Sequence, residues 1–188
     1  MQMNRSILTY TGVLFSPLEP RVEDVCIFDI AHHLSNICRY TGAVQKFYCV
    51  SQHSIYVSKY CDPDYALEGL LHDATEAYLN DIASPVKHAP EFAFYRDAEK
   101  RLDKVIREAF KLKAPHPSIK TADERIYHTE FRDLMPDHPE RHKWYPDAKP
   151  YNFEIEPWTP EYAEREFLLR FQKLRASRIK VLRELMAI

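Results

Sequence analysis

The chain has 188 residues, enough for one domain with a substantial hydrophobic core. Its formal net charge of −2 gives no broad attraction to nucleic acid or to an anionic membrane, although a local basic pocket for a small anion stays open. No apolar run approaches the roughly 20 residues that span a bilayer, and the first ten residues, MQMNRSILTY, lack the apolar core of a signal peptide. We therefore expect a cytoplasmic protein that binds neither nucleic acid nor membrane.

Two scarce residue types narrow the kinds of site that the chain can build. The three glycines are too few and too scattered for a phosphate-binding loop or a dinucleotide-binding fingerprint, so nucleotide phosphates would be held by side chains or a metal. None of the four cysteines forms a CxxC pair, which argues against a thiolate zinc site, and a reducing cytosol argues against disulfides. We interpret Cys26, Cys38, Cys49 and Cys61 as small buried hydrophobic residues.

The predicted elements are mostly helices. Residues 7–15 alternate weakly around a Thr-Gly turn and predict a short hairpin. Helices are predicted at about 29–40, 51–60, 64–79, 90–112, 118–134 and from about 160 to the C-terminus, with Asp29, Ser51 and Asp64 as caps of the first three. A proline-rich stretch follows residue 136, and within it only residues 151–156 resemble a strand.

This pattern predicts an all-α fold with at most a small β element near the N-terminus and at residues 151–156. We expect one domain over residues 1–188. Its motif-bearing core spans about 28–134, and residues 136–188 form a C-terminal extension.

Several ionisable residues fall on predicted buried faces. His53 lies in the apolar stripe of the helix at 51–60, and Asp123 lies at the edge of the buried face at 118–134, in the same series as Glu130. His72 and Asp73 are adjacent in the middle of the helix at 64–79, where they diverge by about 100° and can share only a point beside the helix. Burying such groups without partners costs several kcal/mol, which a bridging metal ion would largely remove.

Each of these residues has a simpler explanation when it is taken alone. His53 could be a hydrogen-bonded core histidine, and Asp123 could be a helix cap or a surface acid. His138 and His142 have ligand-like spacing but lie in a proline-rich loop, so we interpret them as surface residues. A structural zinc site would normally be closed and rich in cysteine. The ordered set H…HD…D on inward faces, with Glu76 one turn beyond the central pair, favours a metal centre.

Three longer stretches carry a family resemblance. The segments SQHSIYVSKY (51–60), LLHDATEAYLNDIASPVK (70–87) and TADER (121–125) resemble those of the HD-domain metal-dependent phosphohydrolases. They are most similar to single-domain bacterial 5'-deoxynucleotidases and to a phage branch that removes dATP and its precursors. The Arg-Tyr pair at 39–40 matches an Arg-aromatic pair of that group. The resemblance covers roughly residues 28–134.

The resemblance also implies residue roles. It implies four metal ligands: His53, His72, Asp73 and Asp123. It implies that Glu76 positions or deprotonates the attacking water and that Asp81 orients the water or the sugar. It implies substrate binding by Arg39 and Lys87, which would hold phosphate, and by Tyr40, which would flank the sugar or base. Asn80 stands where the family pattern leads us to expect glycine.

The residues and the resemblance together predict an enzyme. Two imidazoles and two carboxylates suit one divalent cobalt, manganese, zinc or iron ion better than calcium, and Mg²⁺ can accompany substrate phosphates. Such an ion lowers the pKa of water and polarises phosphorus. The resemblance implies a phosphohydrolase of 2'-deoxynucleotides, with dATP and its lower phosphates as the leading substrates.

Three further expectations accompany this function. A general 5'-deoxynucleotidase acting on dNMPs is the alternative, and an inactive nucleotide-binding or signalling HD module is an alternative of another class. The resemblance favours a homo-oligomer, located in the host cytoplasm if the chain is phage-encoded. A set of aromatic residues in the C-terminal extension could wrap the bundle or meet another subunit: Trp144, Tyr145, Tyr151, Phe153 and Trp158.

Overall fold

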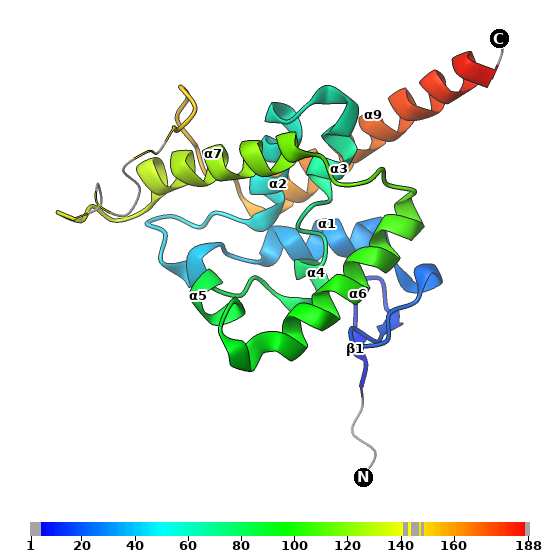
Figure 1. The fold of residues 1–188 in the computed structure, drawn as a ribbon, viewed down its shortest axis with the longest axis horizontal. Coiled ribbons are helices and arrows are strands. Elements are labelled where there is room, and N and C mark those ends of the chain that lie inside the picture. The colour runs from blue at the N-terminus through cyan, green and yellow to red at the C-terminus, as the bar shows by residue number, and fades with distance from the viewer. Residues whose placement is uncertain (1–4, 141–142, 144–146, 148, 187–188) are drawn as a thin grey trace.

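Helices make up most of the described chain, as predicted, and a small two-stranded sheet lies near the N-terminus. The computed structural model describes residues 5–140, 143, 147 and 149–186, and the side chains of the last helix up to residue 180. The α-helices are α1 (Ile27–Asn36), α2 (Val50–Tyr60), α3 (Ala66–Leu70), α4 (Glu76–Leu79), α5 (Ser84–Lys87), α6 (Ala93–Phe110), α7 (Pro117–Leu134) and α9 (Pro160–Met186). The described residues also form the 3-10 turns η1 (Val22–Asp24), before α1, and η2 (Tyr40–Gly42), η3 (Pro63–Tyr65) and η4 (Pro90–Phe92), between helices. Figure 1 shows their arrangement.

The predicted N-terminal hairpin is present. Strands β1 (Ile7–Leu8) and β2 (Leu14–Phe15) pair antiparallel, and the turn between them includes Gly12 at a φ of 85°, which glycine adopts without strain. Phe15 is fully buried, and its ring stacks on that of Tyr78 at a centroid distance of 3.9 Å. Residues 151–156, all of them described, contain no strand, so the small β element is confined to the hairpin.

The predicted helix boundaries and caps need correction. The predicted helix at 64–79 is divided into α3 and α4 by a turn, and α1 ends at Asn36 rather than at about residue 40. α1 begins before Asp29, whose buried carboxylate accepts hydrogen bonds from Thr11 rather than capping the helix. Ser51 lies inside α2, and the Asp64 N–H donates to the Asp62 carboxylate.

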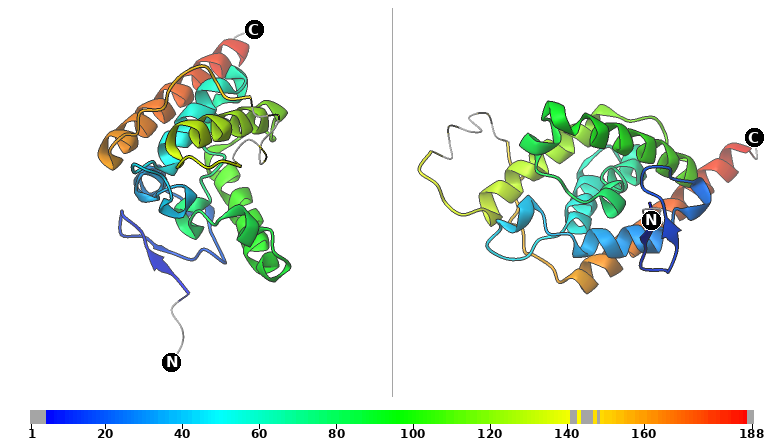
Figure 2. Two further views of the ribbon diagram at one scale, coloured as in Figure 1. Left: turned by 90° about the vertical axis from the view of Figure 1, so that its left-hand side faces the viewer. Right: turned by 90° about the horizontal axis from the view of Figure 1, so that it is seen from below.

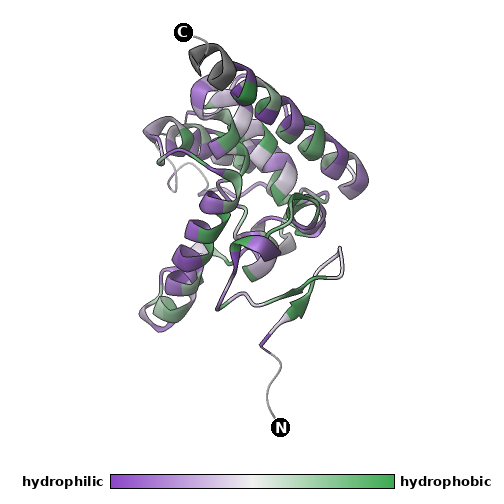
Figure 3. Ribbon diagram, turned by 90° about the vertical axis from the view of Figure 1, so that its right-hand side faces the viewer, coloured by the Kyte–Doolittle hydropathy of each residue, from purple (hydrophilic) through white to green (hydrophobic). Residues whose placement is uncertain are grey.

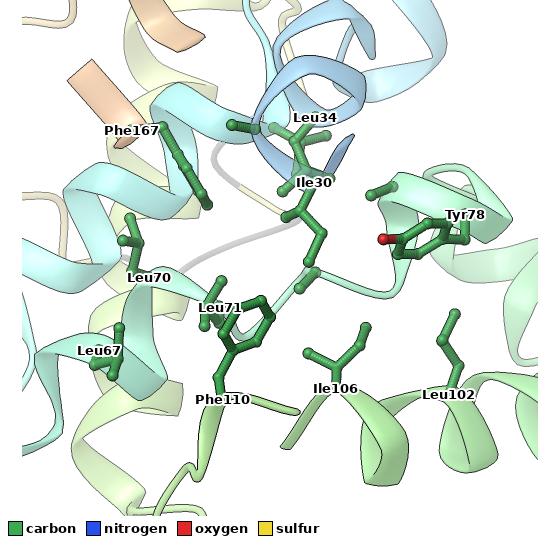
Figure 4. Packing of buried hydrophobic residues seen from close by; sticks show 14 of the residues in the cluster. Ile30, Leu34, Leu67, Leu70, Leu71, Tyr78, Leu102, Ile106, Phe110 and Phe167 are labelled. Carbon is green, nitrogen blue, oxygen red and sulfur yellow. The ribbon is translucent and has the colours of Figure 1, made fainter. Parts of the chain in front are cut away.

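The main hydrophobic core lies between α1, α3, α4, α6 and α9. Figure 4 shows the side chains that meet there: Ile30, Leu34, Leu67, Leu70, Leu71, Tyr78, Leu102, Ile106, Phe110 and Phe167. On α6 the buried residues recur every four positions. The hydropathy colouring of Figure 3 shows hydrophilic residues alternating with hydrophobic ones along this helix and along α9. α2 lies within the bundle (Figure 2), and its side chains are buried from residue 50 to residue 55 and at Val57 and Ser58. It is therefore a rigid platform for a buried side chain.

The described part of the C-terminal extension wraps the bundle. The Gln52 amide on α2 donates to the Glu156 carbonyl at 2.8 Å, and the Trp158 N–H donates to the Gln52 side chain at 2.9 Å. Tyr151 and Phe153 pack their rings against Tyr60. His142, Trp144 and Tyr145 lie outside the described residues. Within the described chain, no helix combines the length and the apolar character that a membrane crossing requires.

Candidate metal centre

His72 and Asp73 lie in the turn between α3 and α4. The backbone leaves the helical path at Leu71, where φ is −106° and ψ is 12°. Neighbouring side chains of an α-helix diverge by about 100°, but here His72 Nε2 lies 3.2 Å from Asp73 Oδ2. The prediction of a continuous helix at this point is wrong. The turn instead allows both side chains to face the same point.

Two imidazoles present their Nε2 atoms to each other at this point. His53 Nδ1 lies 2.6 Å from Glu130 Oε1, and His72 Nδ1 lies 2.9 Å from the Gly69 carbonyl oxygen. Both partners are acceptors, so each Nδ1 carries a hydrogen, and each Nε2 offers a lone pair as a ligand whenever its ring is neutral. The two Nε2 atoms are only 3.3 Å apart. The lone pairs of two facing Nε2 atoms repel each other, whereas a cation between them would be bound by both.

The spacing of the donor atoms fits one ion. Two donors that each lie about 2.1 Å from the same ion are at most about 4.2 Å apart. His53 Nε2 lies 3.1 Å from Asp123 Oδ1, and His72 Nε2 lies 3.9 Å from it. The ligand atoms of His53, His72 and Asp123 all lie within 4.8 Å of one another. Asp73 Oδ2 lies 3.5 Å from His53 Nε2 and 3.2 Å from His72 Nε2, but Asp73 is outside the set of donors that lie within 4.8 Å of one another.

The charges of these groups are mutually dependent. Burial opposes the charged form of His72, but the Asp73 and Asp123 carboxylates raise its pKa well above the usual value. Burial likewise opposes ionisation of Asp123, but hydrogen bonds from His53 and His72 hold its pKa far below the usual range. The pocket therefore favours carboxylates that face positive charge. A divalent ion supplies that charge with neutral imidazoles as ligands.

Glu130 on α7 is the central residue that the sequence analysis did not assign. Its fully buried carboxylate accepts from His53 Nδ1 at 2.6 Å and from the Tyr48 hydroxyl at 2.8 Å. It also accepts from the Tyr40 hydroxyl at 2.7 Å and from Arg39 Nε at 3.1 Å. Burial raises the pKa of Glu130, but Arg39 and His53 outweigh burial and lower it overall, so the group stays ionised. The sequence did carry one indication that Glu130 is buried, because it falls in the apolar series of the helix at 118–134.

Glu76 and Asp81 flank the donor set. Glu76 is the first residue of α4, and its Oε2 is buried without a hydrogen-bond partner among the described residues. Burial and then the Asp73 and Asp81 carboxylates raise the pKa of Glu76 well above its usual value. Burial also raises the pKa of half-buried Asp81, which Arg39 counteracts. An orphaned carboxylate oxygen of this kind is the arrangement that a cation and its water would complete.

Cationic side chains lie beside these acids. Arg39 Nη1 is 3.8 Å from Asp73 Oδ2, and the guanidinium is held in place by Glu130. Lys87 at the end of α5 pairs with Glu99 of α6 at 2.5 Å. Burial lowers the pKa of Lys87, but Glu99 and then Glu76 raise it overall, which places the lysine within electrostatic reach of the acids. All nine predicted site residues are thus linked by contacts or by mutual electrostatic effects.

Comparison with known proteins shows that the chain is similar to two bacterial proteins. No protein-family model matches the chain. An Escherichia coli (strain K12) protein named YfdR, described as uncharacterized, is 37% identical over 175 residues, covering 89% of this chain and 94% of YfdR. A Rhodobacter capsulatus protein, described as uncharacterized, is 34% identical over 120 residues, covering 56% of this chain and 61% of that protein. On this similarity, the chain belongs to the family of E. coli YfdR.

Proposed function

We propose that the protein is a metal-dependent phosphohydrolase of 2'-deoxynucleotides, with dATP and its lower phosphates as the leading substrates. The observation that carries the proposal is the pair of Nε2 atoms of His53 and His72, 3.3 Å apart with both Nδ1 atoms engaged elsewhere. A carboxylate oxygen of Asp123 lies 3.1 Å from His53 Nε2, and one of Asp73 lies 3.2 Å from His72 Nε2, which supports both as further ligands. A cobalt, manganese, zinc or iron ion there supplies Lewis acidity toward water and a phosphate oxygen.

The chain's own residues supply the remaining parts of a hydrolytic site. The Arg39 guanidinium, fixed by Glu130 and 3.8 Å from Asp73, offers positive charge to phosphate oxygens next to the donor set. Lys87 offers a second cation when a phosphate competes with Glu99 for its ammonium group. The unpartnered Oε2 of Glu76 can accept a proton from water, and half-buried Asp81 can orient that water or a sugar hydroxyl.

The nature of the substrate rests on the family resemblance. Two cations beside a metal centre are suited to a phosphate ester or anhydride, whereas the choice of a deoxyribose and of adenine follows from the similarity of the motifs at 51–60 and 70–87. Tyr40 is proposed to flank the sugar or base with its ring, because its hydroxyl already donates to Glu130. The predicted homo-oligomer also rests on the resemblance.

The test is phosphate release from a panel of deoxy- and ribonucleotide mono-, di- and triphosphates, with the protein loaded in turn with Mn²⁺, Co²⁺, Zn²⁺ or Fe²⁺. We expect fastest release from dATP and its lower phosphates and little from ribonucleotides. Equal rates on all four dNMPs without attack on triphosphates would favour a general 5'-deoxynucleotidase. Nucleotide binding without release under any metal would reject an enzyme and favour the inactive binding module.

A matched pair of variants ties the activity to the site. Asp123→Asn removes a predicted ligand, while Glu124→Gln changes the next residue, an exposed acid that pairs with Lys120. Activity that survives Asp123→Asn, or that Glu124→Gln abolishes equally, would exclude this centre as its source.

A further inference from the structure

Cys38 and Cys49 are directly opposite each other in an isolated antiparallel bridge. The Arg39 N–H donates to the Tyr48 carbonyl at 2.9 Å, and the Val50 N–H donates to the Ile37 carbonyl at 3.2 Å. These bonds flank the two cysteines, which makes them a non-hydrogen-bonded pair, the kind whose Cα atoms are about 4.5 Å apart. This separation lies within the range of about 4.4–6.8 Å that a disulfide spans.

The side chains of neighbouring residues show that the two thiols share a face. Arg39 follows Cys38 and Tyr48 precedes Cys49, and both side chains donate a hydrogen bond to the carboxylate of Glu130. Alternate residues of an extended chain point to opposite faces, so Cys38 and Cys49 lie together on the face turned away from Glu130. Cys38 is half-buried and Cys49 is fully buried.

We propose that Cys38 and Cys49 form an intramolecular disulfide when the protein meets a low-molecular-weight disulfide such as oxidised glutathione. The accessible Cys38 thiolate attacks one sulfur of oxidised glutathione, the S–S bond breaks, and one glutathione thiolate leaves. The Cys49 thiolate then attacks the Cys38 sulfur and expels the second glutathione thiolate. The two protein thiols lose two electrons, and their two protons end on the two glutathione thiols.

The bond would close the segment that carries Arg39, one of the two cations proposed to bind phosphate. Residues 39–48 between the cysteines include Arg39 and Tyr40, both bonded to Glu130, and Cys49 immediately precedes α2, which carries His53. In the reduced protein Cys49 Sγ contacts the Ser51 hydroxyl at 3.2 Å, so the thiol lies at the first turn of α2. The disulfide would therefore fix the segment that carries Arg39 to the start of α2, the helix that carries His53. Its formation does not depend on the proposed function.

The experiment uses the full-length reduced protein. It is incubated with mixtures of oxidised and reduced glutathione, its free thiols are alkylated, and it is digested for mass spectrometry. We expect a peptide pair joined through Cys38 and Cys49 and lighter by two hydrogen atoms, with Cys26 and Cys61 alkylated. The oxidised protein should unfold on the order of 5 °C higher than the reduced protein, because the unfolded chain is constrained. Dithiothreitol should reverse both changes.

Matched variants separate this site from general oxidation. Cys26→Ser provides the control, because Cys26 is half-buried like Cys38 and no bridge in the described chain pairs it with another cysteine. Cys26→Ser should keep the linked peptide and the thermal shift, and Cys38→Ser should lose both. Glutathione that stays attached to Cys38, crosslinks that join other cysteines, or alkylation of all four thiols after oxidation would each overturn the proposal. The linked peptide and the thermal shift are measured on the wild-type protein, so they test the proposal even if a cysteine variant fails to fold.

Discussion

At the scale of single residues, Glu130 links His53, a candidate metal ligand, to Arg39 and Tyr40, which are proposed to bind the substrate. One of its oxygens holds His53 in the tautomer whose Nε2 is free, and the other holds Arg39 and Tyr40. An ionised acceptor suits this position, because the hydrogen bond from the Arg39 guanidinium is strongest to a charged oxygen. The carboxylate therefore orients two groups of the candidate site at once.

We expect Glu130→Gln to weaken metal binding by about 10- to 100-fold, as the loss of outer partners of a metal-ligating histidine typically does. The amide keeps the size of the side chain but cannot accept from all four donors. Metal dissociation constants, measured by competition with a chelating dye, check this. Glu124→Gln on the exposed face of the same helix should leave the constant unchanged. A Glu130→Gln constant within about threefold of the wild type would show that the carboxylate is not needed to orient His53.

Glu76 tests the proposed proton transfer. We expect Glu76→Gln to lower turnover on the order of 100-fold or more, because the amide cannot accept a proton from water. Metal content and folding should change little, since Glu76 Oε2 has no hydrogen-bond partner to lose among the described residues. Steady-state kinetics and elemental analysis on the same preparation measure both effects. Turnover within about threefold of the wild type would mean that another group accepts the proton from water, with Asp81 as the next candidate.

Asn80 has a backbone conformation that suits glycine. Its φ of 68° and ψ of 160° lie in a region that is essentially restricted to glycine, where other residues are strained by about 1–3 kcal/mol. The sequence analysis expected glycine at this position from the family pattern, and the chain keeps that conformation with an asparagine. The strained residue lies directly before Asp81 and ends α4.

We expect Asn80→Gly to raise the free energy of unfolding by about 1 kcal/mol, because relief of the strain exceeds the added entropy of the unfolded chain. Asn80→Ala should lower it, because alanine meets the same strain without the hydrogen bond from the Asp81 N–H to Asn80 Oδ1. Urea denaturation of both variants measures the two signs. Equal destabilisation by glycine and alanine would mean that the asparagine side chain, and not the backbone, determines stability here.

At the scale of elements, the break between α3 and α4 was the least predictable feature. The sequence LLHDATEAYL contains neither glycine nor proline and has the apolar spacing of a helix, so local propensity favours a continuous helix. The contacts that compete with that propensity are tertiary: His72 and Asp73 meet His53 of α2. The long helices α6 and α7 could be predicted, because their buried residues recur at helical spacing over many turns.

The N-terminal hairpin supports the short helix α4. Phe15 of β2 stacks on Tyr78 of α4, and His33 of α1 contacts the Ala77 carbonyl at 2.8 Å. A four-residue helix is not stable by itself, so these contacts hold the element that begins with Glu76.

We expect Phe15→Ala to lower the free energy of unfolding by about 3–4 kcal/mol, because it removes a fully buried ring beside Tyr78. Leu14→Ala on the same strand is the matched control. Leu14 is 64% exposed, and its truncation should cost less than about 0.5 kcal/mol. Chemical denaturation measures both values. A similar loss in the two variants would mean that the hairpin contributes through its surface and does not support α4 through its buried ring.

At the scale of the whole molecule, the sequence predicted which residue types meet but not how each is held. The two histidines and two aspartates were identifiable because ionisable side chains on apolar faces need a common partner. The acceptors that fix the imidazoles, Glu130 and the Gly69 carbonyl, depend on how α2, α3 and α7 pack. A backbone carbonyl has no signature in a sequence, and a single buried glutamate does not indicate which helix it faces.

The last prediction follows from the distance in sequence between the ligands. The candidate centre joins α2 through His53, the α3–α4 turn through His72 and α7 through Asp123, so a bound ion holds together segments that separate on unfolding. Binding to the folded state alone stabilises by about 2.7 kcal/mol at 100 times the dissociation constant. For a chain of this size, we expect Mn²⁺, Co²⁺ or Zn²⁺ to raise the unfolding temperature on the order of 5 °C or more over chelator-treated protein. Differential scanning calorimetry measures the shift without any substrate. Asp123→Asn should lose most of it and Glu124→Gln should keep it. An equal shift in both variants would place the ion elsewhere in the molecule.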